Sequence, residues 1–234
     1  MTLGEHLGEL RRRLIVCVVA FVVMAIVTYV LYPQILTFFR HPYCQTVGKG
    51  HSCDLYVTGP LTAFGIRLNV TAYGGLVFGS PAMLYELWRF VTPGLRANER
   101  RYAIPFVVAT FALFGAGAFV AWVTFPHALG FLHAVGGPGI KDIFSPNSYL
   151  GLILALMAIF GLAFEFPVVL VALELANVLT PARLRKWRRA AIVVLVVFAA
   201  VITPSSDPFS MLALAVPLVV FYEGSIAVGR LLGK

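Results

Sequence analysis

The stretch LIVCVVAFVVMAIVTYVL, residues 14–31, carries no charge and is long enough to cross a membrane as one helix. The 234-residue chain is 60% hydrophobic and only 12% charged, whereas a soluble domain is about a quarter charged. The charges cluster between long apolar runs, which exceed the roughly 10-residue alternating strands of a membrane β-barrel. The sequence therefore predicts an all-α integral membrane protein with a single polytopic membrane domain.

Six apolar runs predict six transmembrane helices. They cover residues 14–38, 70–90, 102–126, 149–173, 190–202 and 209–228, and a long outer loop covers residues 39–69. The fifth run holds about 13 residues, which make roughly 20 Å of helix, less than a hydrocarbon core about 30 Å thick. We therefore expect either that neighbouring helices shield this span or that the bilayer thins around it.

The basic residues predict the orientation of the chain. Of the 18 Lys and Arg residues, 14 fall in segments on the same side as the N-terminus and 4 on the other, which predicts that both termini are cytoplasmic. Topology thus accounts for the net charge of +8, and no nucleic-acid partner is expected. The first apolar run is too long for a cleaved signal peptide, so we expect it to be retained.

Two cysteines fall in the predicted outer loop. Cys44 and Cys53 have eight residues between them and would share an oxidising compartment, which predicts a disulfide, with two free thiols as the alternative. Cys17 lies within the first predicted span and is interpreted as a packing residue.

The chain begins with an amphipathic, charged segment, GEHLGELRRRL, residues 4–14. Its leucines recur at helical spacing and predict a helix that lies on the membrane surface and continues into the first span. Thr2 and Glu5 fit a capping box. Glu9 either pairs with Arg13 at i+4, a contact that contributes about 0.3–0.5 kcal/mol, or serves as a ligand.

Three further clusters carry polar residues. In LYELWRFVTPGLRANERR, residues 84–101, Glu99 is either a helix-terminal residue or a ligand. In GLAFEFPVVL, residues 161–170, Glu165 lies inside the fourth span, and Pro167 predicts a kink, so we expect a polar cavity or, alternatively, a buried pair with an arginine. In TPSSDPFS, residues 203–210, Asp207 is predicted to cap the last span.

The remaining acidic residues and the absent catalytic motifs favour a protein that is not an enzyme. Glu174 and Glu223 are interpreted as members of structural ion pairs. The sequence contains no nucleophile elbow, no zinc-protease motif, no phosphate-binding loop and no metal-spaced His/Cys cluster. We therefore expect no catalytic residue, no metal and no cofactor, and hence a protein that is not an enzyme.

The four clusters together resemble the TatC family, the signal-peptide receptor of the twin-arginine protein translocase. The resemblance rests on EHLGELRRRL (5–14), LYELWRFVTPGL (84–95) with ERR (99–101), FEFPV (164–168) and TPSSDPFS (203–210). It implies a concave, cup-like bundle of kinked helices in the bacterial cytoplasmic (inner) membrane. It also implies transport of folded proteins, driven by the proton-motive force.

The resemblance implies roles for named residues. Glu9 and Glu99 would bind the paired arginines of a signal peptide, with Phe90 and Arg101 beside them. The other implied positions are Glu165 and Pro167 on the concave face, as a contact for partner subunits, and Pro60 and Asp207 in an outer cap. The implied partners are folded cargo with twin-arginine signals, single-span TatA/TatB-type subunits, further copies of the chain and membrane lipids.

Two rival functions are compatible with the residues alone. A proton- or ion-coupled small-solute transporter would use Glu165 as its coupling carboxylate. A structural scaffold would only assemble other membrane subunits and would tolerate the loss of both Glu9 and Glu99.

Overall fold

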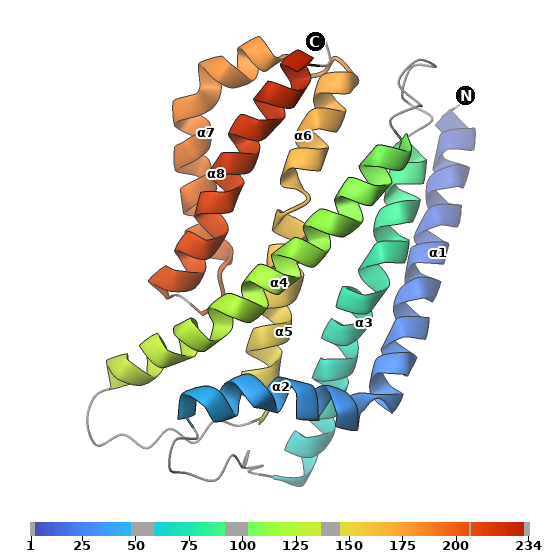
Figure 1. The fold of residues 1–234 in the computed structure, drawn as a ribbon. Helices are drawn as coiled ribbons and strands as arrows, with labels where there is room; N and C mark the ends of the chain where they lie inside the picture. Colours follow the sequence, from blue (N-terminus) through green and yellow to red (C-terminus); the bar gives the residue numbers. More distant parts are fainter. Residues whose placement is uncertain (1–2, 48–58, 92–102, 137–145, 206, 232–234) are drawn as a thin grey trace.

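The computed structural model describes residues 3–47, 59–91, 103–136, 146–205 and 207–231, and within these residues all regular structure is helical. The helices are α1 (Leu3–Val30), α2 (Tyr32–Val47), α3 (Pro60–Val91), α4 (Ala103–Gly136), α5 (Pro146–Ala163), α6 (Phe166–Leu175), α7 (Pro181–Ile202) and α8 (Pro208–Leu231). The start of α1 and the end of α8 lie at the same end of the molecule, which we call the terminal end (Figure 1).

Five helical segments of the described chain are long and apolar enough to cross a membrane. They are Gly8–Val30, Leu61–Leu87, Ile104–Val135, Ser148–Leu175 and Pro208–Leu231. Helix α7 is not among them because its first half carries five basic residues, at positions 183, 185, 186, 188 and 189. The all-helical, multi-pass character predicted from the sequence is confirmed, and the structure supports five spans by this criterion.

The helix predicted to run on to residue 38 is divided in the structure. Helix α1 ends at Val30 and α2 begins at Tyr32, so part of the predicted outer loop is helical as well. Pro33 lies in the first turn of α2, where a missing N–H costs nothing. Helix α2 crosses one face of the bundle near the end opposite the termini (Figure 1).

Close contacts between small residues hold neighbouring helices together. Helices α1 and α3 lie side by side (Figure 1), and a Cβ built at Gly75 of α3 would lie 3.1 Å from the backbone of Ala25 in α1. Helices α4 and α5 meet in the same way at Gly117 and Gly161. Such approaches are typical of membrane bundles, where packing rather than the hydrophobic effect drives helix association.

The fourth predicted span is interrupted at Glu165. Helix α5 ends at Ala163 and α6 begins at Phe166, as expected from Pro167, which has no N–H to donate. At the break, the amide of Glu165 donates to the carbonyl of Leu162, three residues before it, at 3.1 Å. The break leaves a titratable side chain at a bend in the middle of the bundle.

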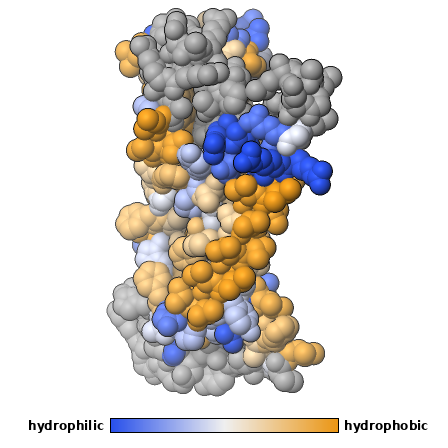
Figure 2. Space-filling view, turned by 90° about the vertical axis from the view of Figure 1, so that its right-hand side faces the viewer, coloured by the Kyte–Doolittle hydropathy of each residue, from blue (hydrophilic) through white to orange (hydrophobic). Residues whose placement is uncertain are grey.

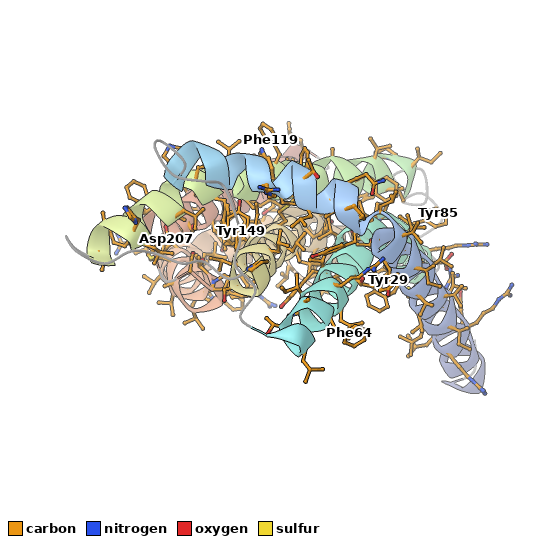
Figure 3. All side chains as sticks on the ribbon, turned by 90° about the horizontal axis from the view of Figure 1, so that it is seen from below. Tyr29, Phe64, Tyr85, Phe119, Tyr149 and Asp207 are labelled. Atoms are coloured by element: carbon orange, nitrogen blue, oxygen red, sulfur yellow. The ribbon has the colours of Figure 1, made fainter. Side chains whose placement is uncertain are left out.

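Tyr149 ties α2 to the rest of the bundle. Its hydroxyl donates to the carbonyl of Phe39 at 2.7 Å, and its ring meets Phe125 edge-on at 5.3 Å between centroids. In the view from below, Tyr149 lies beside α2 (Figure 3). The hydrogen bond satisfies the hydroxyl of Tyr149, a side chain that is almost fully buried.

We expect the change Tyr149→Phe to lower the free energy of unfolding by about 1–2 kcal/mol, because it removes one buried hydrogen bond and little volume. Thermal unfolding of the purified protein in detergent measures this change. The matched variant Tyr85→Phe alters an exposed tyrosine and should leave the melting temperature unchanged. Equal melting temperatures for the two variants would contradict the assignment.

Candidate functional site

A cluster of two carboxylates and one guanidinium joins α1 to α3 near the terminal end. Arg13 donates to Glu9 Oε1 from Nη2 at 2.5 Å and from Nε at 3.2 Å. It also donates from Nη1 to Glu86 Oε2 at 3.0 Å. We call Glu9, Arg13 and Glu86 the acidic clasp.

Two ordinary features of helices build the acidic clasp. Glu9 and Arg13 are four residues apart on α1 and therefore lie on one face. The packing of α3 against α1 then brings Glu86 to the other side of the guanidinium. The Arg13 and Glu86 side chains are 15% and 13% exposed, and that of Glu9 is 25% exposed, so the ion pairs are partly shielded from water.

The acidic clasp borders an open cavity of about 420 Å³. The cavity is lined by Gly8, Glu9, Arg12, Arg13, Val16, Glu86 and Arg89. On this face a hydrophilic band lies directly beside an apolar surface (Figure 2). The site therefore offers carboxylates and arginines at the boundary of the apolar region of α1.

The structure places some of the predicted site residues and not others. Glu9 lies in the acidic clasp, paired with Arg13 as one of the two sequence interpretations expected. Glu99 and Arg101 lie outside the described residues. Phe90 belongs to α3, but its side chain is outside the description. The predicted joint role of Glu9 and Glu99 therefore stays a prediction.

Glu86 was not singled out by the sequence. It stands in the stretch LYELWRF, between Tyr85 and Leu87. One feature of the sequence could have identified Glu86 as a candidate site residue. It is a charged residue one helical turn before Phe90, the last residue of a predicted span. Only the pairing of α3 with α1 gives that position a partner.

Glu165 is buried at the α5–α6 break, with 7% of its surface exposed. Its Oε1 atom has no hydrogen-bond partner within the described residues, and the side chain of the buried Thr110 in α4 lies against it. Among the described Lys and Arg residues, none forms an ion pair with it. The alternative of a buried pair with an arginine is therefore not observed in the described chain.

A cavity beside the α5–α6 break is apolar. It measures about 480 Å³ and lies between α4, α6 and α8. Its lining consists of Pro105, Phe106, Ala109, Leu113, Pro167, Val168, Val171, Val220, Phe221, Gly224, Ser225 and Val228. Glu165 does not line this cavity, and its side chain lies against Thr110, so the polar cavity expected beside Glu165 stays a prediction.

Asp207 caps α8 at the end opposite the termini. Its Oδ1 accepts from the amide of Ser210 at 2.7 Å, and its Oδ2 accepts from the Ser205 hydroxyl. Pro208 is the first helical residue. The carboxylate is 1% exposed, and Figure 3 shows its position. The predicted N-cap is thus confirmed, whereas a role in an outer cap with Pro60 is untested.

The remaining predicted sites give limited information. Cys53 lies outside the described residues and the side chain of Cys44 in α2 is not described, so the disulfide stays a prediction. Within the described segments no group of His, Cys, Asp and Glu is arranged to hold a metal ion. Glu223 pairs with Arg188, as expected, whereas both Glu174 oxygens lack a partner in the described structure.

Comparisons with known proteins agree on one family. The family model described as "Sec-independent protein translocase protein (TatC)" matches residues 5–217. A protein of that name from Frankia casuarinae is 41% identical over 99% of this chain and 66% of its own length. One from Corynebacterium kroppenstedtii is 33% identical over 99% and 62%, so the chain spans just under two thirds of these two relatives. One from Aquifex aeolicus is 34% identical over 99% and 95%.

Solved structures show the same likeness in three dimensions. The crystal structure of the twin-arginine translocase receptor TatC in DDM superimposes with a TM-score of 0.80 at 32% identity, covering 96% of this chain and 99% of the other. A second crystal structure of that receptor gives the same TM-score and identity over 98% and 100% of the two chains. The likeness therefore extends over nearly all of the chain.

Proposed function

We propose that this chain, which belongs to the TatC family of Sec-independent protein translocase proteins, is the core receptor subunit of a twin-arginine translocase. The family is a non-enzymatic one, in keeping with the expected lack of a catalytic site. The comparisons give no support to the alternative of a small-solute transporter. In this role the protein binds the signal peptides of folded cargo and nucleates a complex that the proton-motive force drives.

We further propose six spans with both termini in the cytoplasm of a bacterial cell. The five long apolar helices supply five spans, and the apolar second half of α7, residues 190–202, supplies a short sixth. An even number of crossings agrees with the common position of α1's start and α8's end (Figure 1). The excess of Lys and Arg on the terminal side supports a cytoplasmic location for that end.

The acidic clasp is the observation that carries the proposed binding site. Two hydrogen bonds join the Arg13 guanidinium to Glu9, and a third joins it to Glu86, so the site is already shaped to hold a guanidinium. A planar guanidinium matches carboxylates through several donors at once, whereas a lysine ammonium is a point charge. In the proposed function Glu9 and Glu99 receive the two signal arginines, with Phe90 and Arg101 beside them.

Other surfaces suit the proposed partners. The apolar cavity between α4, α6 and α8 suits the apolar helix of a single-span TatA/TatB-type subunit. A separate contact of such a subunit with Glu165, through a polar residue of its own, would have to form at the α5–α6 break and not in this cavity. The basic first half of α7 suits anionic lipid headgroups. Pro60 and Asp207 would belong to an outer cap, and several copies of the chain would associate in the working complex.

The proposed function predicts that Glu9→Ala combined with Glu99→Ala abolishes preferential binding of an Arg-Arg signal peptide over a Lys-Lys one. We expect at least about a tenfold loss of affinity for the Arg-Arg peptide, because its charge-assisted hydrogen bonds lose their acceptors. Site-specific crosslinking of a signal peptide to the protein in membranes measures this loss.

The control removes a carboxylate that serves another purpose. Glu223→Ala breaks the ion pair with Arg188 between α7 and α8 and should leave peptide crosslinking intact. Undiminished Arg-Arg crosslinking in the correctly inserted Glu9→Ala/Glu99→Ala protein would show that the site is wrongly assigned.

A further inference from the structure

We infer that Arg13 is an internal competitor that occupies the signal-arginine acceptor of the free receptor, and that Glu86 is a further ligand for the incoming arginine. This inference rests on the proposed function. Binding would then be an exchange, in which a guanidinium of the signal peptide replaces that of Arg13 between Glu9 and Glu86.

The geometry shows that the acceptor is already in use. Three donors of Arg13 are taken up by the two carboxylates, and the side chains of all three residues are mostly shielded from water. A peptide guanidinium that needs the same oxygens cannot reach them while Arg13 stays in place. Because Glu9 is the most exposed member of the acidic clasp, exchange would begin there.

The charge of the cavity favours exchange over simple addition. Its lining contains three arginines, Arg12, Arg13 and Arg89, against two glutamates, which gives a net charge of +1. A further cation that entered beside Arg13 would add to that excess. If Arg13 instead turns out toward water, the number of guanidinium–carboxylate pairs is kept and the cation density between the carboxylates does not rise.

Exchange keeps Glu9 and Glu86 in the arrangement that binds a guanidinium. It also keeps a guanidinium between the two carboxylates both before and after the peptide binds. Glu9 and Glu86 both contact Arg13, so in its absence their charges would repel each other. The Arg89 guanidinium lies 4.0 Å from Glu86 Oε1, but its side chain is exposed, so it would offset only part of this repulsion. Arg13 therefore holds both acceptors in position in the free protein. The consequence is a lower apparent affinity, since only the fraction of receptors with Arg13 displaced can bind.

Competition and structural support predict opposite results for one variant. If Arg13 competes, Arg13→Ala frees both acceptors and raises the affinity for an Arg-Arg peptide. If Arg13 only keeps the carboxylates in place, the same change lowers the affinity. Competition divides the affinities for Arg-Arg and Lys-Lys peptides by the same factor, so their ratio should stay nearly constant in the Arg13→Ala protein.

The experiment measures binding of fluorescent Arg-Arg, Lys-Lys and Ala-Ala signal peptides to the full chain in detergent by anisotropy. The matched control is Arg12→Ala, which removes the same charge from the same cavity but breaks no hydrogen bond of the acidic clasp. We expect Arg13→Ala to bind the Arg-Arg peptide about tenfold more tightly than Arg12→Ala does, a difference equivalent to ~1.4 kcal/mol. An affinity equal to or below that of Arg12→Ala overturns the inference.

A double variant tests Glu86 separately. Compared with Arg13→Ala alone, Arg13→Ala/Glu86→Gln should bind the Arg-Arg peptide about tenfold more weakly if Glu86 is a ligand. Equal affinity would mean that Glu86 serves only to hold Arg13, which refutes that part of the inference.

Two further outcomes are decisive. If Arg13→Ala does not insert and fold, Arg13→Gln repeats the test with a longer, neutral side chain, and failure of both variants marks Arg13 as a structural residue and overturns the inference. If the unaltered protein binds Arg-Arg no better than Ala-Ala, the proposed function itself is wrong. Tight Arg-Arg binding by the unaltered protein without any gain in Arg13→Ala rejects the internal competitor alone.

Discussion

Replacement of Gly117 by alanine is expected to lower the free energy of unfolding in detergent by about 1–3 kcal/mol, the usual cost of overpacking. A Cβ at this position would lie 2.5 Å from the carbonyl oxygen of Phe160 and 3.0 Å from the Cα of Gly161. Both are backbone atoms, which cannot rotate aside as a flexible side chain can. Helices α4 and α5 must therefore move apart along a contact that depends on close packing.

Gly115 provides a matched control on the same helix. A Cβ built there meets nothing within 4 Å, so Gly115→Ala should leave stability unchanged or raise it by up to about 1 kcal/mol, because alanine is the better helix former. Thermal unfolding of both variants, followed by loss of helical circular dichroism, measures the difference. A Gly117→Ala protein as stable as Gly115→Ala would mean that the α4–α5 contact is looser than described.

The spans could be predicted because hydropathy is a local property, but the end of the first span was placed too late. Pro33 was a local signal for a break, since it has no N–H to donate to the carbonyl of Tyr29, four residues before it. The partner that this carbonyl finds instead comes from a distant part of the chain. Arg67 of α3 lies 3.9 Å from the centre of the Tyr29 ring and donates to the Tyr29 carbonyl at 3.1 Å.

The same division between local and distant contacts applies to the acidic clasp. The pairing of Glu9 with Arg13 follows from a spacing of four residues, and the sequence named it as one of two interpretations. The contact between Arg13 and Glu86 joins residues 73 positions apart. No helical periodicity identifies such a partner, because it depends on which faces of α1 and α3 meet.

Glu174 shows why a charged residue near a span's end does not guarantee an ion pair. The sequence predicted a pair for both Glu174 and Glu223, and only the second prediction is correct. In the structure Glu174 is buried against Gly229 of α8, and neither of its oxygens has a described partner. Whether Glu174 meets a basic residue depends on the rotation of α6 about its axis. The residues next to Glu174 in the sequence do not predict that rotation.

The second large effect is expected at the start of α8. Asp207→Ala should lower the free energy of unfolding by about 1–3 kcal/mol, because the buried Ser210 amide and Ser205 hydroxyl both lose their acceptor. Thermal unfolding in detergent measures the loss, and hydrogen exchange at the Ser210 amide should rise in the same variant.

Asp207→Asn separates the cap from the charge. The asparagine side chain keeps an oxygen for the Ser210 amide but replaces the second oxygen with a donor, so the charge-assisted bond from the Ser205 hydroxyl gives way to a weaker, neutral one in which that hydroxyl accepts. Its stability should therefore fall between those of the unaltered protein and Asp207→Ala. If Asp207→Asn were as unstable as Asp207→Ala, the amide bond would contribute little, and the carboxylate's contact with Ser205 would be the main constraint on the α7–α8 connection. If instead Asp207→Ala retained full stability, the buried cap would not hold α8 in place.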